Sequence, residues 1–391
     1  MDILVLDTIH GGLEIARQLE AMGHAVDAVD VYRGKMGPVQ DAYDLIVAPV
    51  HLDPGHPYLS IPAKRIVSHH EAVAWILWDC VPHPMVEITG ARGKTTTAHA
   101  LASICEGPGV LHTSQGTFSY PDRTLLWKRS ITPASVIPAA REARACGGWL
   151  IAEESLGVTG AGDLAIITSA EDYPIGAGKK SGLSEKLRLV RHIEMVVAPR
   201  ALPGLDRIVT ISQVTRCMAE SCLFSWQGRE GMFSNPLLVL EGYRTPLRLA
   251  ATAACLLGIN PVSLGKFHAV GGRMAVERSE GRVIVDNANS GTDRMTTIEA
   301  AHYARSQTCA DSLTLVIGEV SRTICEGFSA EEVEETIRLI QPEHVILVGD
   351  RVKSLSERFG YPHTNTLDEG QKIARNISST GGIVLAVKCW R

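Results

Sequence analysis

The stretch VEITGARGKTTTAHAL, residues 86–101, holds the side chains whose types and spacing best suit phosphate chemistry. An apolar strand runs into a turn with Gly90 and Gly93, and a helix follows. Such a turn presents free backbone N–H groups, and the helix dipole favours a bound anion. Lys94 can reach the β- and γ-phosphates as a point charge, and the Thr95 hydroxyl can ligate Mg²⁺. The residues predicted to bind the phosphates are Gly90, Ala91, Arg92, Gly93, Lys94, Thr95 and Thr96.

The loop departs from the general phosphate-loop pattern G-x-x-x-x-G-K-[ST], because Ile88 stands where the first glycine would be. The alternative interpretation is an ordinary strand–turn–helix with an exposed lysine. A glycine–lysine–threonine run after a buried strand favours the phosphate site.

A carboxylate is also needed to hold the Mg²⁺ that bridges phosphate oxygens. The strand WLIAEES supplies two candidates, Glu153 and Glu154. Side chains alternate along a strand, so only one of them faces the nucleotide. We prefer Glu153 as the metal ligand, with Glu154 as the competing candidate.

These residues need parallel sheets to position them. Apolar strands alternate with helical patterns along the whole chain, from ILVLD near the N-terminus to GIVLAVK near the C-terminus. With 391 residues the chain is long enough for two or three domains. We predict an α/β protein of three consecutive α/β domains: a Rossmann-like domain (1–82), a phosphate-loop ATPase domain (83–262) and a second Rossmann-like domain (263–391).

The composition limits the classes of partner and the cell compartment that we expect. The formal net charge is −5 and no long basic run appears, which argues against nucleic acid. No apolar run reaches the length of a membrane span, and acids stand in the N-terminal segment where a signal peptide would have basic residues. The nine cysteines show no CxxC pair, and Cys217 and Cys222 are the closest two. We expect reduced thiols in a cytoplasmic protein that binds a small molecule.

The segment TGARGKTTT resembles the loop of the Mur ligase superfamily. The resemblance implies that this chain has three α/β domains and joins substrates by means of ATP and Mg²⁺. Members of that superfamily carry a metal-binding glutamate in an E-x-S context, which Glu153 matches. The resemblance therefore implies that Lys94 and Glu153 are catalytic. The resemblance continues in GGRMAV, VIVDNANSGT and IVLAVKCWR, which would bring Arg273 to phosphate, Asp286 to the ribose and Lys388 to the substrate. The last segment departs from the superfamily pattern at Cys389 and Trp390, although Arg391 is kept.

One part of the superfamily pattern is broken. Many members use a histidine and a later carbamylated lysine to bind a second Mg²⁺. Tyr173 stands at the histidine position here, and Lys179 and Lys180 lie closer than the superfamily spacing implies. We therefore assign no residue of this chain to a second Mg²⁺ site.

The opening ILVLDTIHGG, together with SITPAS, IAEES, DNANSGT and the compact length, resembles the archaeal coenzyme F(430) synthetase branch. That resemblance implies a nickel hydrocorphinoid carboxylate as substrate, activated as an acyl phosphate and closed to a carbocyclic ketone. His10, Gly11 and Gly12 form the first strand–helix turn, where ligands of parallel sheets bind, and are predicted to contact the substrate. Two alternatives remain open: an amide ligase acting on a cell-wall (pseudomurein-like) precursor, and a module that senses ATP without ligase chemistry.

The adjacent histidines His69 and His70 could be mistaken for metal ligands. They lie within Ser68-His-His-Glu71, the pattern of a capping box at a helix start. We predict a structural role for both.

Overall fold

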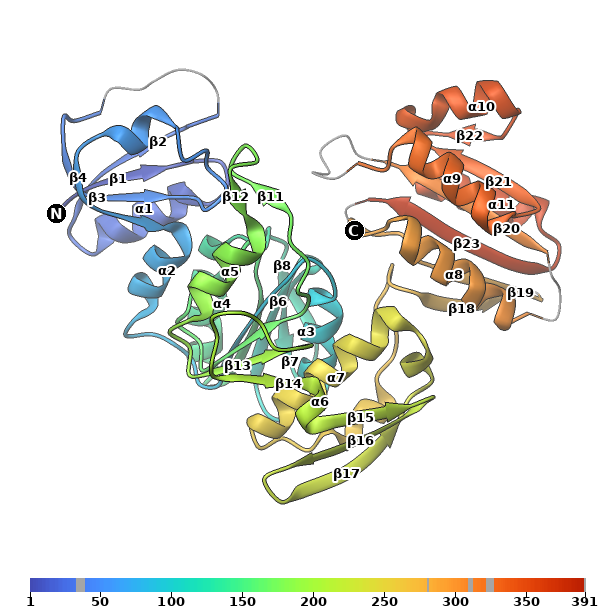
Figure 1. The fold of residues 1–391 in the computed structure, drawn as a ribbon, viewed down its shortest axis with the longest axis horizontal. Helices are drawn as coiled ribbons and strands as arrows, with labels where there is room; N and C mark the ends of the chain where they lie inside the picture. The colour runs from blue at the N-terminus through green and yellow to red at the C-terminus, as the bar shows by residue number, and fades with distance from the viewer. Residues whose placement is uncertain (33–38, 280, 309–311, 321–326, 390–391) are drawn as a thin grey trace. The chain divides into compact units, whose positions relative to one another are not determined.

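The computed structural model describes residues 1–32, 39–279, 281–308, 312–320 and 327–389. The chain divides into two compact units, Met1–Phe267 and His268–Arg391. Both are mixed α/β structures with parallel sheets, as the sequence predicts (Figure 1). Among the described residues, no helix combines the length and the apolar character that crossing a membrane requires.

The first unit opens with a four-stranded parallel sheet. Its strands run in the order β2 (Ala25–Val29), β1 (Asp2–Leu6), β3 (Tyr43–Ala48) and β4 (Ala63–Ser68). Helix α1 (Gly12–Ala21) follows β1, and α2 (His69–Leu77) follows β4. Strand β1 is central and buried, so the turn after it lies at the carboxyl edge where parallel sheets bind ligands.

An eight-stranded sheet forms the middle of the first unit. Its order is β14 (Ile208–Thr210), β13 (Met195–Ala198), β10 (Leu164–Ile167), β5 (Met85–Thr89), β9 (Trp149–Glu153), β6 (Gly109–Thr113), β7 (Gly116–Tyr120) and β8 (Thr124–Trp127). The main helices here are α3 (Lys94–Ala102), α4 (Val136–Ala145), α5 (Gly182–Val190) and α7 (Glu241–Leu256). Strands β5, β9 and β10 are neighbours, so their carboxyl ends bring Thr89, Glu153 and Thr168 close together.

The two sheets of the first unit share apolar packing. One cluster of buried side chains includes Ile3 of β1, Val73 of α2, Val136 of α4 and Leu150 of β9. The predicted boundaries at 82/83 and 262/263 stay predictions.

Several smaller elements were not foreseen. The pairs β11 (Pro174–Ile175) with β12 (Lys180–Ser181), and β15 (Thr215–Met218) with β16 (Ser221–Trp226) and β17 (Arg229–Ser234), are antiparallel. A short helix α6 (Ile211–Val214) precedes β15. Cys217 lies directly opposite Cys222 in the β15–β16 register, and the two form a disulfide. The expectation of reduced thiols is therefore wrong for this pair, because the hairpin that brings them together was not recognised.

The second unit is a six-stranded sheet. Its order is β18 (Ala275–Ser279), β19 (Arg282–Asp286), β23 (Gly381–Lys388), β20 (Leu313–Glu319), β21 (His344–Val348) and β22 (His363–Thr364), with only β18 antiparallel. The helices are α8 (Arg294–Ser306), α9 (Ala330–Ile340), α10 (Lys353–Phe359) and α11 (Leu367–Ile377). Strand β23 is buried along its whole length, as its continuous apolar run predicts.

Candidate active site

The predicted phosphate loop joins β5 to α3. Gly90 has φ 147° and Gly93, which caps α3, has φ 80°, so both adopt backbone conformations that favour glycine. A Cβ on Gly90 would lie 2.1 Å from Oγ1 of Thr168, so this position has no space for a side chain. The Ala91 N–H donates to Oγ of Ser169 at 2.8 Å. Thr168 and Ser169, which follow β10, therefore contact the loop and help to fix its backbone conformation.

Three of the predicted side chains meet over this loop. The Thr95 hydroxyl donates to Oε2 of Glu153 at 2.8 Å, and Nζ of Lys94 lies 3.9 Å from Oε1 of the same carboxylate. Lys94 also donates to the Gly90 carbonyl at 3.1 Å. The backbone N–H of Ser114, just after β6, donates to Glu153 at 3.1 Å. Glu153 is 2 % exposed, so its charge is screened little by water and acts strongly on Lys94.

The other candidate carboxylate, Glu154, directly follows β9, is fully buried and lies beside Glu87. Burial, followed by the negative charge of Glu87, raises the pKa of Glu154 well above its ordinary value. Glu87 itself accepts hydrogen bonds from the backbone N–H groups of Thr159 and Gly162 at 2.7 and 2.9 Å. We therefore assign the proton of this acid pair to Glu154. The arrangement agrees with the preference for Glu153, whose role as a metal ligand remains a prediction.

A lysine that the sequence analysis missed lies close to the loop. Lys186 of α5 is 1 % exposed, and its Nζ donates to the hydroxyl of Tyr173 at 2.8 Å while lying 4.2 Å from the centre of that ring. Burial, followed by the charge of Lys94, lowers the pKa of Lys186 to about 8. By contrast, Lys179 and Lys180 reach the first sheet, where they bind the Asp53 carboxylate at 2.7 Å and the Val50 carbonyl at 2.9 Å.

The predicted substrate turn follows β1. Gly11 caps α1 with φ 100°, and a Cβ on Gly12 would lie 2.0 Å from the carbonyl oxygen of Asp7. A Cβ on Gly11 would lie 2.6 Å from Cβ of Ala134, so this turn packs against the segment before α4. That segment also meets the strand that carries Glu153, because the Ser155 N–H donates to the Ile131 carbonyl at 2.8 Å. The segment before α4 therefore contacts both the predicted substrate turn and the chain that follows Glu153.

The capping-box prediction for the adjacent histidines is confirmed. Ser68 caps α2 and pairs reciprocally with Glu71. His69 and His70 are both 2 % exposed, and their Nε2 atoms lie 2.8 and 3.0 Å from the carbonyl oxygens of Leu6 and Ser155. Burial lowers the pKa of His69 to about 4 and that of His70 to about 3, so both are neutral near pH 7.

The second unit carries the remaining candidates. Asp286 ends β19 and accepts the Ala288 N–H at 3.1 Å. Lys388 ends β23, is 5 % exposed, and has its Nζ 5.9 Å from the centre of the Phe328 ring. Arg273 precedes β18, next to Met274 with φ 58°. The roles of these three residues at the nucleotide or substrate remain predictions. Trp390 and Arg391 lie outside the described residues.

The residues of the loop fit MgATP. The loop lies at a helix start, and its Ala91 and Arg92 N–H groups donate to one neutral hydroxyl, that of Ser169, which a phosphate oxygen would replace. One hydroxyl and one carboxylate, Thr95 and Glu153, supply the hard oxygen ligands that Mg²⁺ prefers. Sequence reasoning missed two supports of this arrangement, Ser114 and Ser169. The only signal for Ser169 was its position directly after a buried strand.

Comparison with solved structures defines the class of fold. The chain is similar to a pseudomurein peptide ligase type C from Methanothermus fervidus, with TM-score 0.56 and 17 % identity over 99 % of this chain and 97 % of that one. It is also similar to MurF from Acinetobacter baumannii, with TM-score 0.59 and 14 % identity over 90 % and 88 % of the two chains. A third similar structure is the MurF ligase from Thermotoga maritima in complex with ADP, with TM-score 0.53 and 15 % identity over 89 % and 91 %. The fold is that of the Mur ligases.

Sequence comparison narrows the class to a family. The chain is 31 % identical to the coenzyme F(430) synthetase of Methanosarcina acetivorans over 100 % of its own length and 98 % of that protein. It is 21 % identical to the coenzyme F(430) synthetase of Methanocaldococcus jannaschii, over 96 % of each. Residues 276–389 match the family model described as coenzyme F430 synthetase CfbE, C-terminal domain. The chain belongs to the coenzyme F(430) synthetase family.

Proposed function

We propose that this protein uses ATP to close the carbocyclic ring of 15,17(3)-seco-F(430)-17(3)-acid, a nickel hydrocorphinoid, in the biosynthesis of coenzyme F(430) during methanogenesis. The observation that carries the proposal is the 31 % identity to a coenzyme F(430) synthetase over the whole chain. The geometry around Glu153 supports ATP use, because a buried carboxylate, a hydroxyl and an amine converge on a glycine turn.

The proposed reaction has two steps. First, an oxygen of the substrate carboxylate attacks the γ-phosphorus, and ADP leaves. Second, a ring carbon attacks the acyl carbon, phosphate leaves as the C–C bond forms, and the proton of that ring carbon passes to solvent. Phosphoryl transfer depends mainly on positioning and on neutralising charge, which the protein supplies through fixed groups.

Each residue has a stated part in this proposal. The N–H groups of the loop from Gly90 to Gly93 hold the phosphates, and Lys94 neutralises the charge that develops on the transferred group. Thr95 and Glu153 hold Mg²⁺, which neutralises phosphate charge when bound. In the second unit, Arg273 is proposed to contact phosphate, Asp286 the ribose and Lys388 the substrate.

The amine of Lys186 fits this chemistry as well. A lysine with a pKa of about 8 is neutral in about a tenth of the molecules at pH 7, far more than an ordinary lysine. A neutral amine can take up CO₂ as a carbamate, the state that the superfamily resemblance implies for a lysine after this loop. We propose Lys186, rather than Lys179 or Lys180, for that role. We also place the protein in the cytoplasm, where ATP is available.

The test is phosphate release from MgATP by the purified protein. One reaction receives the nickel seco-acid alone, and a second receives amino acids with cell-wall acceptors. Release with the seco-acid and no amine, together with an absorbance change as the ring closes, supports the proposal. Release only when an amino acid is present would make the protein an amide ligase. ATP binding without turnover in either reaction would make it an ATP-sensing module.

A further inference from the structure

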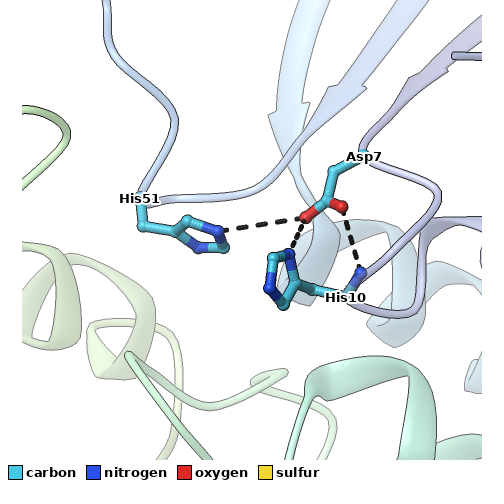
Figure 2. Close-up of side chains that lie close together, drawn as sticks. All are labelled: Asp7, His10 and His51. Atoms are coloured by element: carbon cyan, nitrogen blue, oxygen red, sulfur yellow. Dashed lines mark hydrogen bonds and ion pairs between the residues drawn. The ribbon is translucent and has the colours of Figure 1, made fainter. Parts of the chain in front are cut away.

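A cluster of two histidines and a buried aspartate lies at the carboxyl edge of the first sheet, on the predicted substrate turn. Figure 2 shows Asp7 and His10 of the β1–α1 turn and His51 of the segment after β3, with dashed lines that join the Asp7 carboxylate to both histidines. One ligand atom from each lies within 4.8 Å of the others, and among the described residues this is the one cluster of three His, Cys, Asp or Glu side chains with metal-ligand spacing.

Among the described residues, the hydrogen bonds of the cluster leave two ring nitrogens without a bond, Nε2 of His10 and Nδ1 of His51, and His10 is the more exposed of the two side chains. Oδ1 of Asp7 accepts the backbone N–H groups of Ile9 and His10 at 2.9 and 3.0 Å, and Oδ2 lies 2.8 Å from Nδ1 of His10. Nε2 of His51 is bonded to the hydroxyl of Tyr32 at 2.6 Å. In the part of the chain that the structure describes, Nε2 of His10 has no such bond, and its side chain is 48 % exposed.

The aspartate orients the ring that carries that nitrogen. Asp7 is fully buried and held at φ 75°, a conformation that non-glycine residues rarely adopt and that concentrates at functional sites. In the neutral imidazole, a carboxylate at Nδ1 of His10 favours the tautomer with the proton on Nδ1 and the lone pair on Nε2. A histidine oriented by a carboxylate through its other nitrogen is the usual arrangement of a metal ligand in proteins.

The surroundings suit a flat macrocycle better than a free ion. The rings of Tyr32 and His51 lie parallel within 6°, and both stand edge-on to His10 at centroid distances of 5.3 Å. Tyr32 is 44 % exposed, so part of this aromatic surface is open to a ligand. Both carboxylate oxygens of Asp7 are already hydrogen-bonded, and His10 carries the more exposed of the two unbonded ring nitrogens, so it is the better placed to meet a metal held in a macrocycle.

We propose that Nε2 of His10 is the axial ligand of the nickel ion in the macrocyclic substrate, with Asp7 as the residue that positions it. This inference rests on the proposed function. It assigns the metal-recognition step to the first sheet and the ATP step to the loop after β5. A macrocycle that lacks the metal would then lose most of its affinity.

The experiment measures nickel coordination rather than turnover. X-ray absorption at the nickel edge is recorded for the nickel seco-acid bound to the full-length protein without ATP, where an imidazole ligand gives outer-shell scattering. The wild-type protein is expected to show this scattering and His10→Ala to lack it, with free imidazole restoring it. Asp7→Asn is expected to lose it too, because an amide facing Nδ1 moves the proton to Nε2, and substrate affinity should fall by roughly 10- to 100-fold.

Two controls separate the alternatives. His83→Ala removes another exposed histidine paired with an aspartate, since Nδ1 of His83 lies 2.9 Å from Asp163, and should leave the spectrum unchanged. His51→Gln should retain the imidazole scattering. Loss of scattering in His51→Gln but not in His10→Ala would overturn the assignment, as would a wild-type spectrum without imidazole. If the wild-type protein closes the ring with ATP but shows no imidazole ligand, only this inference fails. If it neither binds nor converts the seco-acid, the proposed function fails as well.

Discussion

Two turns of the first unit have the same backbone arrangement, but their N–H groups donate to different acceptors. The turn after β1 and the turn after β5 both leave a central parallel strand, and both enter a helix through a glycine with positive φ, Gly11 or Gly93. In the first turn, the carboxylate of Asp7 accepts two N–H groups of its own turn. In the second, the Ala91 N–H donates to a neutral hydroxyl from another strand, Ser169.

That difference determines which kind of ligand each turn can bind. A built-in carboxylate neutralises the N–H groups of the first turn and repels an incoming phosphate. A hydroxyl can be displaced by a phosphate oxygen, which carries more charge and so binds the N–H groups more strongly. The same strand–turn–helix device therefore holds an imidazole in one place and is proposed to hold phosphates in the other.

The largest effect is expected at the amine of the second turn. Lys94→Ala should lower turnover by about 10²–10³-fold or more, because a fixed charge on the transferred phosphoryl group is lost. Phosphate release with saturating MgATP and substrate measures this. Lys64→Ala is the control, since Lys64 is an exposed lysine that pairs with Asp44 at 2.6 Å. Near-full turnover of Lys94→Ala would remove Lys94 from the reaction.

The two adjacent acids should behave differently. Glu153→Gln should reduce turnover by about 10²-fold or more and weaken the dependence on Mg²⁺, because a neutral amide is a poor ligand for a hard cation. Glu154→Gln should change activity little, since the raised pKa keeps this acid protonated and an amide has the same shape. Magnesium titrations of both variants make the comparison. Equal losses would mean that the strand face does not select the ligand.

Sequence patterns were sufficient for the elements with strong local signals. The charged amphipathic run AEEVEETIRLI forms α9 with the predicted bounds, and GIVLAVK lies within the buried strand β23. The capping box of α2 was equally local. The alternation argument also agrees with the different surroundings of the two acids, because Glu153 accepts from Thr95 and Glu154 lies beside Glu87.

Contacts distant in sequence could not be predicted in this way. Lys186 lies in a helix of ordinary amphipathic pattern, and only the fold brings it beside Tyr173 and within the field of Lys94. The partnership of His51 with Asp7 joins the ends of two strands and left no pattern in the sequence. The disulfide required the register of an unrecognised hairpin.

Giving the second turn a carboxylate like that of the first would test this comparison directly. Ser169→Asp places a carboxylate at the N–H groups of the second turn and so copies the arrangement made by Asp7 in the first. Affinity for ATP should fall by about 100-fold, because a phosphate must then displace a charged acceptor of the same sign. Calorimetric titration with a non-hydrolysable ATP analogue measures it, and Ser169→Asn is the neutral control. Unchanged affinity would show that the two turns do not differ in the proposed way.

The buried amine should leave a signature in stability. The pKa of Lys186 is lowered from 10.5 to about 8, so between these values the unfolded chain binds more protons and stability rises with pH. Lys186→Met removes that dependence and should be more stable near pH 7, by at most about 3 kcal/mol. Thermal unfolding of both proteins from pH 7 to 10 measures the effect. An equal pH dependence in the variant would mean that Lys186 keeps its proton in the fold.

The smallest effect is expected when the hydroxyl is simply removed. Ser169→Ala leaves the Ala91 N–H without its 2.8 Å acceptor, which should destabilise the ligand-free protein by about 1 kcal/mol. Phosphate oxygens would supply the missing acceptor, so ATP affinity should stay the same or rise by up to about fivefold. Unfolding with and without the ATP analogue separates the two quantities, because a ligand stabilises only the state that binds it. If affinity instead falls with stability, Ser169 contacts the nucleotide directly, and the hydroxyl is a part of the binding site rather than an acceptor that the phosphate displaces.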